Sequence, residues 1–256
     1  MFVVDKIYKY DLQKIFYYPK NMNYRLAHNS HEGIKRSHNE DTYGIDADKH
    51  IFLVADGMGG HDHGEIASAL ARDYIMAGLV EDNDLSDTIY RANDAIIACS
   101  LEKQSQLPMG TTVAIVRFDA QQCHCAWVGD SRIYRFRDGE LTAISSDHSY
   151  VQELVDQQLI TRDQARNHPH RNVVTQALGV TDNSELNIAR VTDLWQPGDK
   201  FLVCSDGLTE EVDDTEIASI LSQNLAPGEL CDQLLIKALE NGGSDNITAI
   251  VLVLDQ

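Results

Sequence analysis

The stretch that decides the fold is IFLVADGMGGHDHGE, residues 51–65. Its first five residues are an apolar run typical of a buried strand, and the run stops at Asp56-Gly57. A loop rich in glycine and histidine follows, and helical spacing of apolar residues begins at Glu65. A hydrophobic strand therefore delivers a carboxylate at its end, next to a glycine that permits a sharp bend of the backbone.

The same arrangement recurs along the chain. FLVCSDG (201–207) and CAWVGDSR (125–132) are apolar runs closed by an aspartate, and GGSDNIT (242–248) places an aspartate just before a final apolar run. The four candidates are Asp56, Asp130, Asp206 and Asp245. An Asp-Gly pair is also an ordinary turn dipeptide, and Asp138-Gly139 is predicted to be only a hairpin turn.

Taken together, these aspartates favour a cation site. Four carboxylates at one edge of packed sheets would repel each other unless cations lay between them. An all-oxygen ligand set suits Mg²⁺ or Mn²⁺. His61 and His63 raise the alternative of zinc, but they lie two residues apart in a loop, and we favour solvated loop residues.

A second polar cluster is GIKRSHNEDTYG (33–44), in which Arg36 precedes Glu40 and Asp41. The planar guanidinium of arginine suits bidentate binding of a phosphate, and neighbouring carboxylates can orient metal-bound water. A surface ion pair is the competing interpretation of Arg36. The residues alone do not decide between the two.

The chain alternates apolar strands with amphipathic helices from Tyr24 onward. Helices are predicted over residues 65–79, 85–101, 214–221 and 229–239, with short helical pieces at 151–160, 161–168 and 172–179. Strands are predicted over 51–55, 112–118, 123–128, 133–136, 200–204 and 247–254, and those at 112–136 are expected to form an antiparallel meander. This order predicts an α+β architecture of two packed antiparallel sheets with helices outside.

Composition excludes several classes of protein. The chain has 256 residues, 43% of them hydrophobic, enough for one globular domain, and a formal charge of −19 argues against nucleic acid as a partner. No apolar run is long enough to cross a membrane, so we expect a cytoplasmic protein without membrane insertion. Five cysteines without a CxxC pair argue against a disulfide framework. Residues 1–21, rich in tyrosine, are expected to be an extension of uncertain role before a single domain at 22–256.

Six motifs in order resemble those of the metal-dependent type-2C (PPM) serine/threonine protein phosphatases in their bacterial form. They are RSHNED (36–41), VADGMGGH (54–61), GTT (110–112), VGDSR (128–132), SDGL (205–208) and GGSDNIT (242–248). The resemblance implies a four-layer α-β-β-α sandwich with a small flap at about 147–180 beside the active site.

The resemblance also implies a centre of two Mn²⁺ or Mg²⁺ ions. Asp56 would bridge the two ions, the Gly57 carbonyl would bind one of them, and Asp206 and Asp245 would hold the other. The resemblance implies no covalent phosphoenzyme, because water activated by the two ions would be the nucleophile.

Further residues follow by their positions in the motifs. Glu40 or Asp41 would act on the second metal through water, and Asp130 would hold a third, weaker ion together with Asp206. Arg36 falls on the phosphate-binding arginine. Many eukaryotic members carry histidine after the Asp-Gly pair as a candidate general acid, where this chain has Met58. Leaving-group protonation would then come from metal-bound water, or from His61 or His148.

The implied function is hydrolysis of phosphoserine and phosphothreonine in proteins by a monomeric enzyme that opposes a bacterial Ser/Thr kinase and acts on that kinase and its targets. Two alternatives stand beside it. A catalytically silent binding module would be expected to lack a metal aspartate or Arg36, and this chain lacks neither. A hydrolase of small phosphoesters would share the same metal site.

Overall fold

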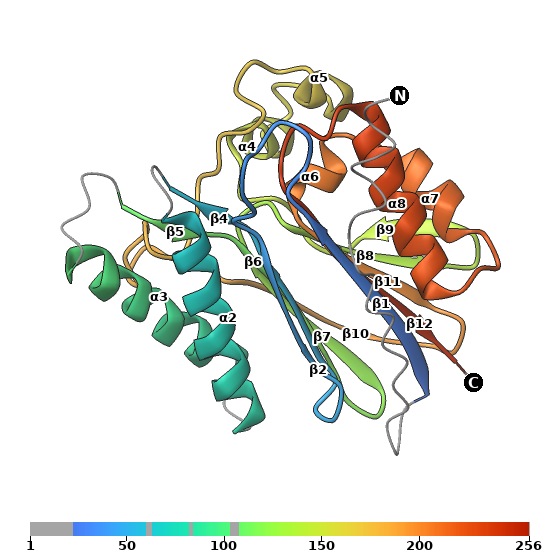
Figure 1. The fold of residues 1–256 in the computed structure, drawn as a ribbon, viewed down its shortest axis with the longest axis horizontal. Helices are drawn as coiled ribbons and strands as arrows, with labels where there is room; N and C mark the ends of the chain where they lie inside the picture. Colours follow the sequence, from blue (N-terminus) through green and yellow to red (C-terminus); the bar gives the residue numbers. More distant parts are fainter. Residues whose placement is uncertain (1–22, 60–62, 82–83, 103–107, 256) are drawn as a thin grey trace.

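The computed structural model describes residues 23–59, 63–81, 84–102 and 108–255. The extension predicted at residues 1–21 and His61 lie outside these residues. Within them, two five-stranded antiparallel sheets lie face to face (Figure 1). The first sheet has the order β1 (Tyr24–His31), β12 (Ile247–Leu254), β11 (Lys200–Cys204), β8 (Arg132–Arg137), β9 (Glu140–Ala143). The second has the order β10 (Ala189–Leu194), β7 (Gln122–Val128), β6 (Val113–Phe118), β3 (Ile51–Ala55), β2 (Thr42–Asp46).

Helices cover the outer face of each sheet (Figure 1). The second sheet is covered by α2 (Gly64–Val80) and α3 (Leu85–Glu102), and the first by α6 (Asp206–Thr209), α7 (Asp214–Leu221) and α8 (Pro227–Asn241). Two short helices, α4 (Tyr150–Asp156) and α5 (Arg162–Arg166), belong to the predicted flap, and β4 (Gly57–Met58) pairs with β5 (Gly110–Thr111). The predicted four-layer α-β-β-α sandwich is therefore confirmed.

The stretch at residues 51–65 explains why both faces of the second sheet are covered. In β3, Phe52 and Val54 face the core between the sheets, whereas Ile51, Leu53 and Ala55 face α2 and α3. All five side chains are fully buried. A strand that is apolar on both faces is stable only in the middle of a layered structure.

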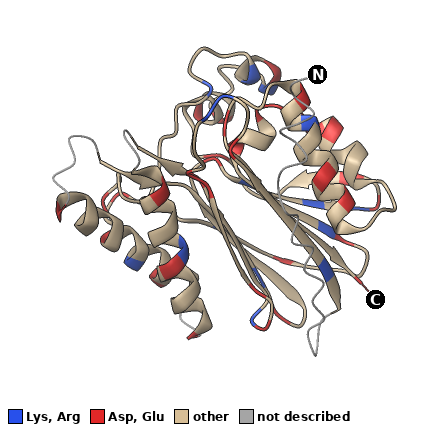
Figure 2. Cartoon of the chain, viewed as in Figure 1, with Lys and Arg blue, Asp and Glu red and all other residues tan. Residues whose placement is uncertain are grey.

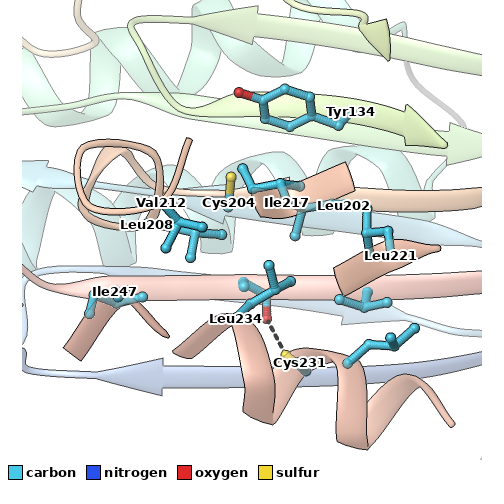
Figure 3. Packing of buried hydrophobic residues seen from close by; sticks show 14 of the residues in the cluster. Tyr134, Leu202, Cys204, Leu208, Val212, Ile217, Leu221, Cys231, Leu234 and Ile247 are labelled. Atoms are coloured by element: carbon cyan, nitrogen blue, oxygen red, sulfur yellow. Dashed lines mark hydrogen bonds between the residues drawn. The ribbon is translucent and has the colours of Figure 1, made fainter. Parts of the chain in front are cut away.

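The outer core of the first sheet is built in the same way. Figure 3 shows Tyr134 of β8 and Leu202 of β11 in the cluster that packs the first sheet against its helices. Leu208, Ile217 and Leu234 supply the helical side of the cluster from α6, α7 and α8. This packing fixes the position of α6, which begins at the end of β11.

The predicted meander is wrong at its last step. β6 pairs with β7 in the second sheet, but β8 pairs with β11 in the first. The chain turns at Gly129, whose φ of +101° lies in the left-handed region that favours glycine. A Cβ atom there would lie 2.6 Å from the Cβ atom of Thr112. This turn carries the chain, with Asp130, from one sheet to the other.

Other segments also differ from the prediction. Residues 172–179 are not helical, because their backbone forms bridges from Val174 to Ser149 and from Leu178 to Thr111. β10 was not predicted: it is an edge strand with a mostly exposed sequence, so it lacks a periodic apolar pattern. The hairpin at Asp138-Gly139 is confirmed, with φ values of +52° and +85°. No helix in the described ranges has the length and apolar character needed to span a bilayer.

Candidate functional site

Aspartates from both sheets meet at one edge of the sandwich. Asp56 follows β3, and Asp41 precedes β2, whose Thr42 is paired with Ala55. Asp206 begins α6 directly after β11 and Ser205. Acidic segments gather where the ends of these strands approach α6 (Figure 2). The sheet pairing therefore brings together carboxylates that are far apart in the sequence.

Asp56 and Asp206 lie at the centre of this edge. Their carboxyl groups are close enough to share a hydrogen bond. Burial raises the pKa of Asp56 well above its usual range, and the charges of Asp41, Asp206 and Asp130 raise it further. Burial also raises the pKa of Asp206. Two carboxylates this close disfavour each other's charged form.

Asp41 belongs to the same cluster. Its Oδ2 atom accepts a hydrogen bond of 2.7 Å from Ser205 Oγ. Burial raises the pKa of Asp41 to about 7, against the effect of its hydrogen bonds from Ser205 and Thr248. Among the described residues, Asp41 Oδ1 and Asp206 Oδ1 are buried oxygens without a hydrogen-bond partner. A buried oxygen without a partner costs folding free energy unless a ligand or a water binds to it.

Asp245 lies beside Arg36 at the rim of the cluster. Arg36 Nη2 donates to Asp245 Oδ2 at 2.7 Å, and the backbone N–H of Asn246 donates to Asp245 Oδ1 at 2.8 Å. The hydrogen bond that Arg36 donates to Asp245 raises the pKa of Arg36, and the charges of Glu40 and Asp56 act in the same direction. The Arg36 side chain remains 53% exposed, so its guanidinium lies between the acidic cluster and solvent.

Glu40 has contacts that differ from those of Asp41. Its backbone N–H donates to Asn246 Oδ1 at 2.8 Å, and its Oε1 atom lies 3.3 Å from His38 Nε2. A Cβ atom on Gly64 would lie 2.7 Å from the Glu40 carboxyl carbon, so this carboxylate packs against the start of α2. Of the two predicted alternatives, Asp41 is the one whose charge acts on Asp56.

Gly57 is fixed by close backbone contacts. A Cβ atom at this position would lie 2.2 Å from the Gly64 carbonyl oxygen and 2.6 Å from the Glu40 carbonyl oxygen. These are distances that real Cβ atoms do not reach, and the neighbouring atoms are backbone. The glycine therefore allows β4 to pass between the Glu40 segment and α2.

Asp130 is buried at the crossing from β7 to β8, and burial raises its pKa well above the usual range, with a further contribution from the charge of Asp206. Arg132, two residues later, binds both carboxylate oxygens of Asp147 at 2.7–3.1 Å. The charge of Arg132 lowers the pKa of Asp130 and of Asp206. Sequence reasoning did not single out Arg132, although it lies within the VGDSR motif.

Glu210 was also missed. It lies four residues after Asp206, one turn further along the chain, and burial followed by the charge of Asp206 raises its pKa to about 7. The helical spacing of Asp206 and Glu210 was the available signal, but α6 was not predicted. Asn246 was missed as well: its side-chain amide donates to the carbonyl oxygens of Glu32 and His38, both at 2.9 Å.

Two of the histidines considered in the sequence analysis, His63 and His148, lie within the described residues. His63 is the residue that precedes α2. His148 accepts a hydrogen bond at Nδ1 from the backbone N–H of Gly129 at 3.3 Å, and its own backbone N–H donates to the Gly129 carbonyl at 2.9 Å. Burial lowers the pKa of His148 below 6.5. A neutral, accepting imidazole anchors the turn at Gly129 and is poorly suited to act as a general acid.

The donor set fits hard divalent cations in its chemistry. All candidate donors are oxygens, and two of them, on Asp41 and Asp206, are buried and unpartnered within the described segments. In the same segments, no group of three or more His, Cys, Asp or Glu side chains is already arranged to hold a metal ion. In the structure Asp56 interacts with Asp206, and Asp245 forms an ion pair with Arg36.

Comparison with known proteins matches this architecture. Residues 29–239 match the model of the protein phosphatase 2C family. The serine/threonine protein phosphatase PstP of Mycobacterium tuberculosis is 36% identical over 237 residues, which cover 89% of this chain but only 44% of PstP. The chain therefore spans less than half of the length of that relative. The serine/threonine phosphatase stp of Listeria monocytogenes is 36% identical over 233 residues, covering 86% of this chain and 92% of its own.

Solved structures agree with the sequence matches. Stp1 of Staphylococcus aureus, a serine/threonine phosphatase, superposes with a TM-score of 0.85 at 29% identity, covering 93% of this chain and 97% of its own. The catalytic domain of PstP, solved in complex with two manganese ions, gives a TM-score of 0.80 at 34% identity and covers 91% of this chain and 99% of its own. This chain belongs to the protein phosphatase 2C family.

Proposed function

We propose that this protein is a metal-dependent phosphatase that hydrolyses phosphoserine and phosphothreonine in proteins. The observation that carries the proposal is the cluster of buried aspartates from both sheets next to a half-exposed arginine. Carboxylates suited to cations beside a guanidinium suited to phosphate are the two parts that metal-dependent phosphoryl transfer requires. Membership of the protein phosphatase 2C family supports the same activity.

Asp56, the Gly57 carbonyl, Asp206 and Asp245 are the proposed ligands of two ions, Mn²⁺ or Mg²⁺. The related catalytic domain solved with two manganese ions supports this assignment. When bound, divalent ions supply positive charge that lowers the pKa of water and polarises the phosphoryl group. Asp130, with Asp206, is proposed to hold a third, weaker ion.

Asp41 is proposed to orient water at the second ion, in preference to Glu40. Its Oδ2 atom is fixed by Ser205 while Oδ1 is left without a partner in the described chain, so one oxygen is positioned and the other is available. The carboxylate of Glu40 lies instead against His38 and Gly64. Glu40 therefore shapes the wall of the site through its backbone and its packing.

Arg36 is proposed to bind the phosphate of the substrate. Among its contacts within the described residues, only Nη2 is engaged, with Asp245, so other N–H groups of the guanidinium are available to phosphate oxygens. The ion pair with Asp245 also orients the guanidinium across the rim of the cluster. Substrate binding, more than the reactivity of water, is the step that this residue controls.

Cys204, the cysteine nearest in sequence to Asp206, is not suited to covalent catalysis. Cys204, which precedes Ser205 and Asp206, is fully buried, and burial raises the pKa of its thiol to about 12. A thiol of that pKa supplies almost no thiolate at neutral pH, and the thiolate is the nucleophilic form. Water is therefore the proposed nucleophile.

The proposed substrates are phosphorylated proteins, among them a bacterial Ser/Thr kinase and the targets of that kinase. We propose that the protein works in the cytoplasm as a monomer, without nucleic acid as a partner. The net charge of −19 supports the exclusion of polyanionic partners. Residues 22–256 are proposed to act as one catalytic domain.

The first experiment is phosphate release from a phosphothreonine peptide by metal-stripped protein, with Mn²⁺, Mg²⁺, Ca²⁺, Zn²⁺ or no metal restored. Activity with Mn²⁺ or Mg²⁺ that is lost in Asp206→Ala supports the proposal, whereas the matched variant Asp138→Ala in the β8–β9 turn should retain it. Absence of activity with every metal, in protein shown to be folded by circular dichroism, would instead indicate a silent binding module.

A further inference from the structure

Residues 161–171, here called the arginine segment, carry positive charge on a strongly acidic protein. The segment contains Arg162, Arg166 and Arg171, all exposed, against the single carboxylate of Asp163. The whole chain has 40 acidic and 21 basic residues. A local excess of arginine in such a sequence needs a physical explanation, because general solubility is already provided by the acidic residues.

These arginines lack the partners that other arginines have. Seven arginines pair with a carboxylate among the described residues: Arg25, Arg36, Arg72, Arg132, Arg135, Arg137 and, at 3.9 Å, Arg190. None of the three in the arginine segment forms an ion pair with a carboxylate in the part of the chain that the structure describes. Their charge is therefore directed to solvent.

The local structure disfavours part of this charge. Arg162 is the first residue of α5, where positive charge opposes the helix dipole, and Arg166 lies four residues later, where like charges repel. The helix dipole favours Arg166 at the last turn but explains neither Arg162 nor Arg171. Charge kept at a small local cost is expected to act on something outside the chain.

The arginine segment is rigidly built. Thr161 and Gln164 form a capping box at the start of α5, with hydrogen bonds of 2.8 and 3.3 Å. The rings of His168, His170 and Tyr150 contact each other with centroids 5.7–6.0 Å apart, which ties the end of the segment to α4. The arginines are thus presented from a fixed surface.

The surface is also fixed relative to the acidic edge. Beyond the segment, the backbone N–H of Thr175 donates to the His148 carbonyl at 2.8 Å, and His148 is bonded to Gly129, which precedes Asp130. The charge of Arg171 acts on Glu210, one turn after Asp206. Arg171 is therefore near enough to Glu210 for the two charges to interact, and α5 lies at the same end of the sandwich as α6 (Figure 1).

We propose that Arg162, Arg166 and Arg171 bind anionic side chains that flank the phosphorylated residue of a protein substrate. The inference rests on the proposed phosphatase function. Guanidinium groups pair with carboxylates and with phosphates through the same bidentate geometry, so acidic residues and a second phosphorylated residue are both suitable. On a protein of charge −19, this surface supplies the local attraction that an acidic substrate otherwise lacks.

The test compares three phosphothreonine peptides with the full-length Mn²⁺-loaded protein. The first peptide has glutamates two to five residues from the phosphothreonine, and the second has glutamines at the same positions. The third keeps the phosphothreonine and has a non-hydrolysable phosphonate residue at one of these flanking positions. The expected kcat/KM for the glutamate peptide is about tenfold above that for the glutamine peptide, because exposed ion pairs each contribute little and several act together. The advantage should fall towards one in about 0.5 M salt. Comparison of the glutamate and phosphonate peptides identifies the preferred source of the negative charge.

Two charge-matched double variants locate the effect. R162Q/R166Q should reduce the ratio of kcat/KM between the glutamate and glutamine peptides, through KM for the glutamate peptide. R91Q/R190Q removes two exposed arginines from α3 and β10 and should leave that ratio unchanged. The single variant R171Q should reduce the ratio as well. Use of a ratio within each variant cancels any change in overall activity.

The outcomes separate this inference from the function on which it rests. Equal kcat/KM for the glutamate and glutamine peptides in the wild-type protein would overturn the inference alone, as would a preference that survives in R162Q/R166Q and R171Q. Absence of metal-dependent hydrolysis of every peptide would overturn the proposed function. A preference lost equally in R91Q/R190Q would show that net charge, and not the arginine segment, is responsible.

Discussion

Glu211 holds Ser244 through two hydrogen bonds to one oxygen. Glu211 Oε1 accepts from the Ser244 backbone N–H at 2.9 Å and from Ser244 Oγ at 2.6 Å. The Glu211 carbonyl accepts from Asn241 Nδ2 at 2.6 Å, so the residue braces the turn that precedes Asp245 from both sides. Glu211 lies five residues after Asp206, and this contact therefore links two of the proposed metal ligands.

We predict that Glu211→Ala lowers the free energy of unfolding by about 2 kcal/mol, because it leaves two donors of Ser244 without their charged partner. It should also weaken Mn²⁺ binding, since the turn before Asp245 is no longer braced. Urea denaturation and calorimetric titration with Mn²⁺ measure the two effects. Glu211→Gln keeps an accepting oxygen and should recover most of both. Wild-type Mn²⁺ affinity in Glu211→Ala would show that the turn holds its position without this contact.

Substitution of Arg36 should act mainly on KM. Arg36→Ala removes the guanidinium proposed to bind phosphate, and we expect KM for a phosphothreonine peptide to rise about tenfold or more with a smaller change in kcat. Steady-state kinetics at saturating Mn²⁺ separate the two constants. Arg25→Ala, which removes an ion pair with Asp255 at the start of β1, serves as the control. An unchanged KM in Arg36→Ala would reduce Arg36 to the surface ion pair with Asp245.

Gly57 should tolerate no side chain. The Cβ atom of Gly57→Ala would meet the carbonyl oxygens of Gly64 and Glu40 at 2.2 and 2.6 Å, so backbone must move, and we expect a loss of about 3 kcal/mol or more. Gly139→Ala is the matched control: its Cβ atom meets nothing within 4 Å, and only its φ of +85° costs energy, about 1–2 kcal/mol. Equal losses in the two variants, measured by urea denaturation, would contradict the close packing around β4.

His148 should make stability fall on the acid side of neutrality. Its folded pKa lies below the usual 6.5 because of burial, so the unfolded chain binds a proton before the folded protein does. The stability that this group contributes is complete above pH 6.5 and is lost as the pH falls through the folded pKa.

The measurement is the urea midpoint of the wild type and of His148→Asn between pH 8 and 5. The Asn side chain can keep an oxygen acceptor for the Gly129 N–H but does not titrate, so the difference between the two proteins should shrink as the pH falls. His28 and His50, whose pKa values burial also lowers, remain in both proteins and cancel in the comparison. A difference that is constant with pH would contradict the neutral state of His148.

Sequence patterns predicted the layers well because the apolar runs identify the buried strands. β3 and β12 are apolar on both faces, and such strands need covered sheets on either side. The meander failed at Gly129 because pairing beyond a short turn depends on backbone direction, which a single glycine reverses. β10 was missed because an exposed edge strand carries no apolar periodicity.

The candidate site was predictable where aspartates end apolar runs. Asp56 and Asp206 could be found in this way because their positions follow from strand ends. Glu211 and Arg132 could not, because their roles depend on contacts with Ser244 and Asp147 that only the folded chain creates. The effect of the Arg171 charge on Glu210 likewise depends on the folded chain.

The crossing at Gly129 has a consequence for how the protein matures. Asp41 and Asp56 are attached to the second sheet and Asp206 and Asp245 to the first, with Asp130 on the strand connection between them. A cation bound as proposed would be held by residues from both layers, so its site would be complete only when the two layers are fully docked. During refolding, tight cation binding should therefore appear last, after each sheet has formed. A chain whose two sheets are docked incorrectly would lack a complete cation site.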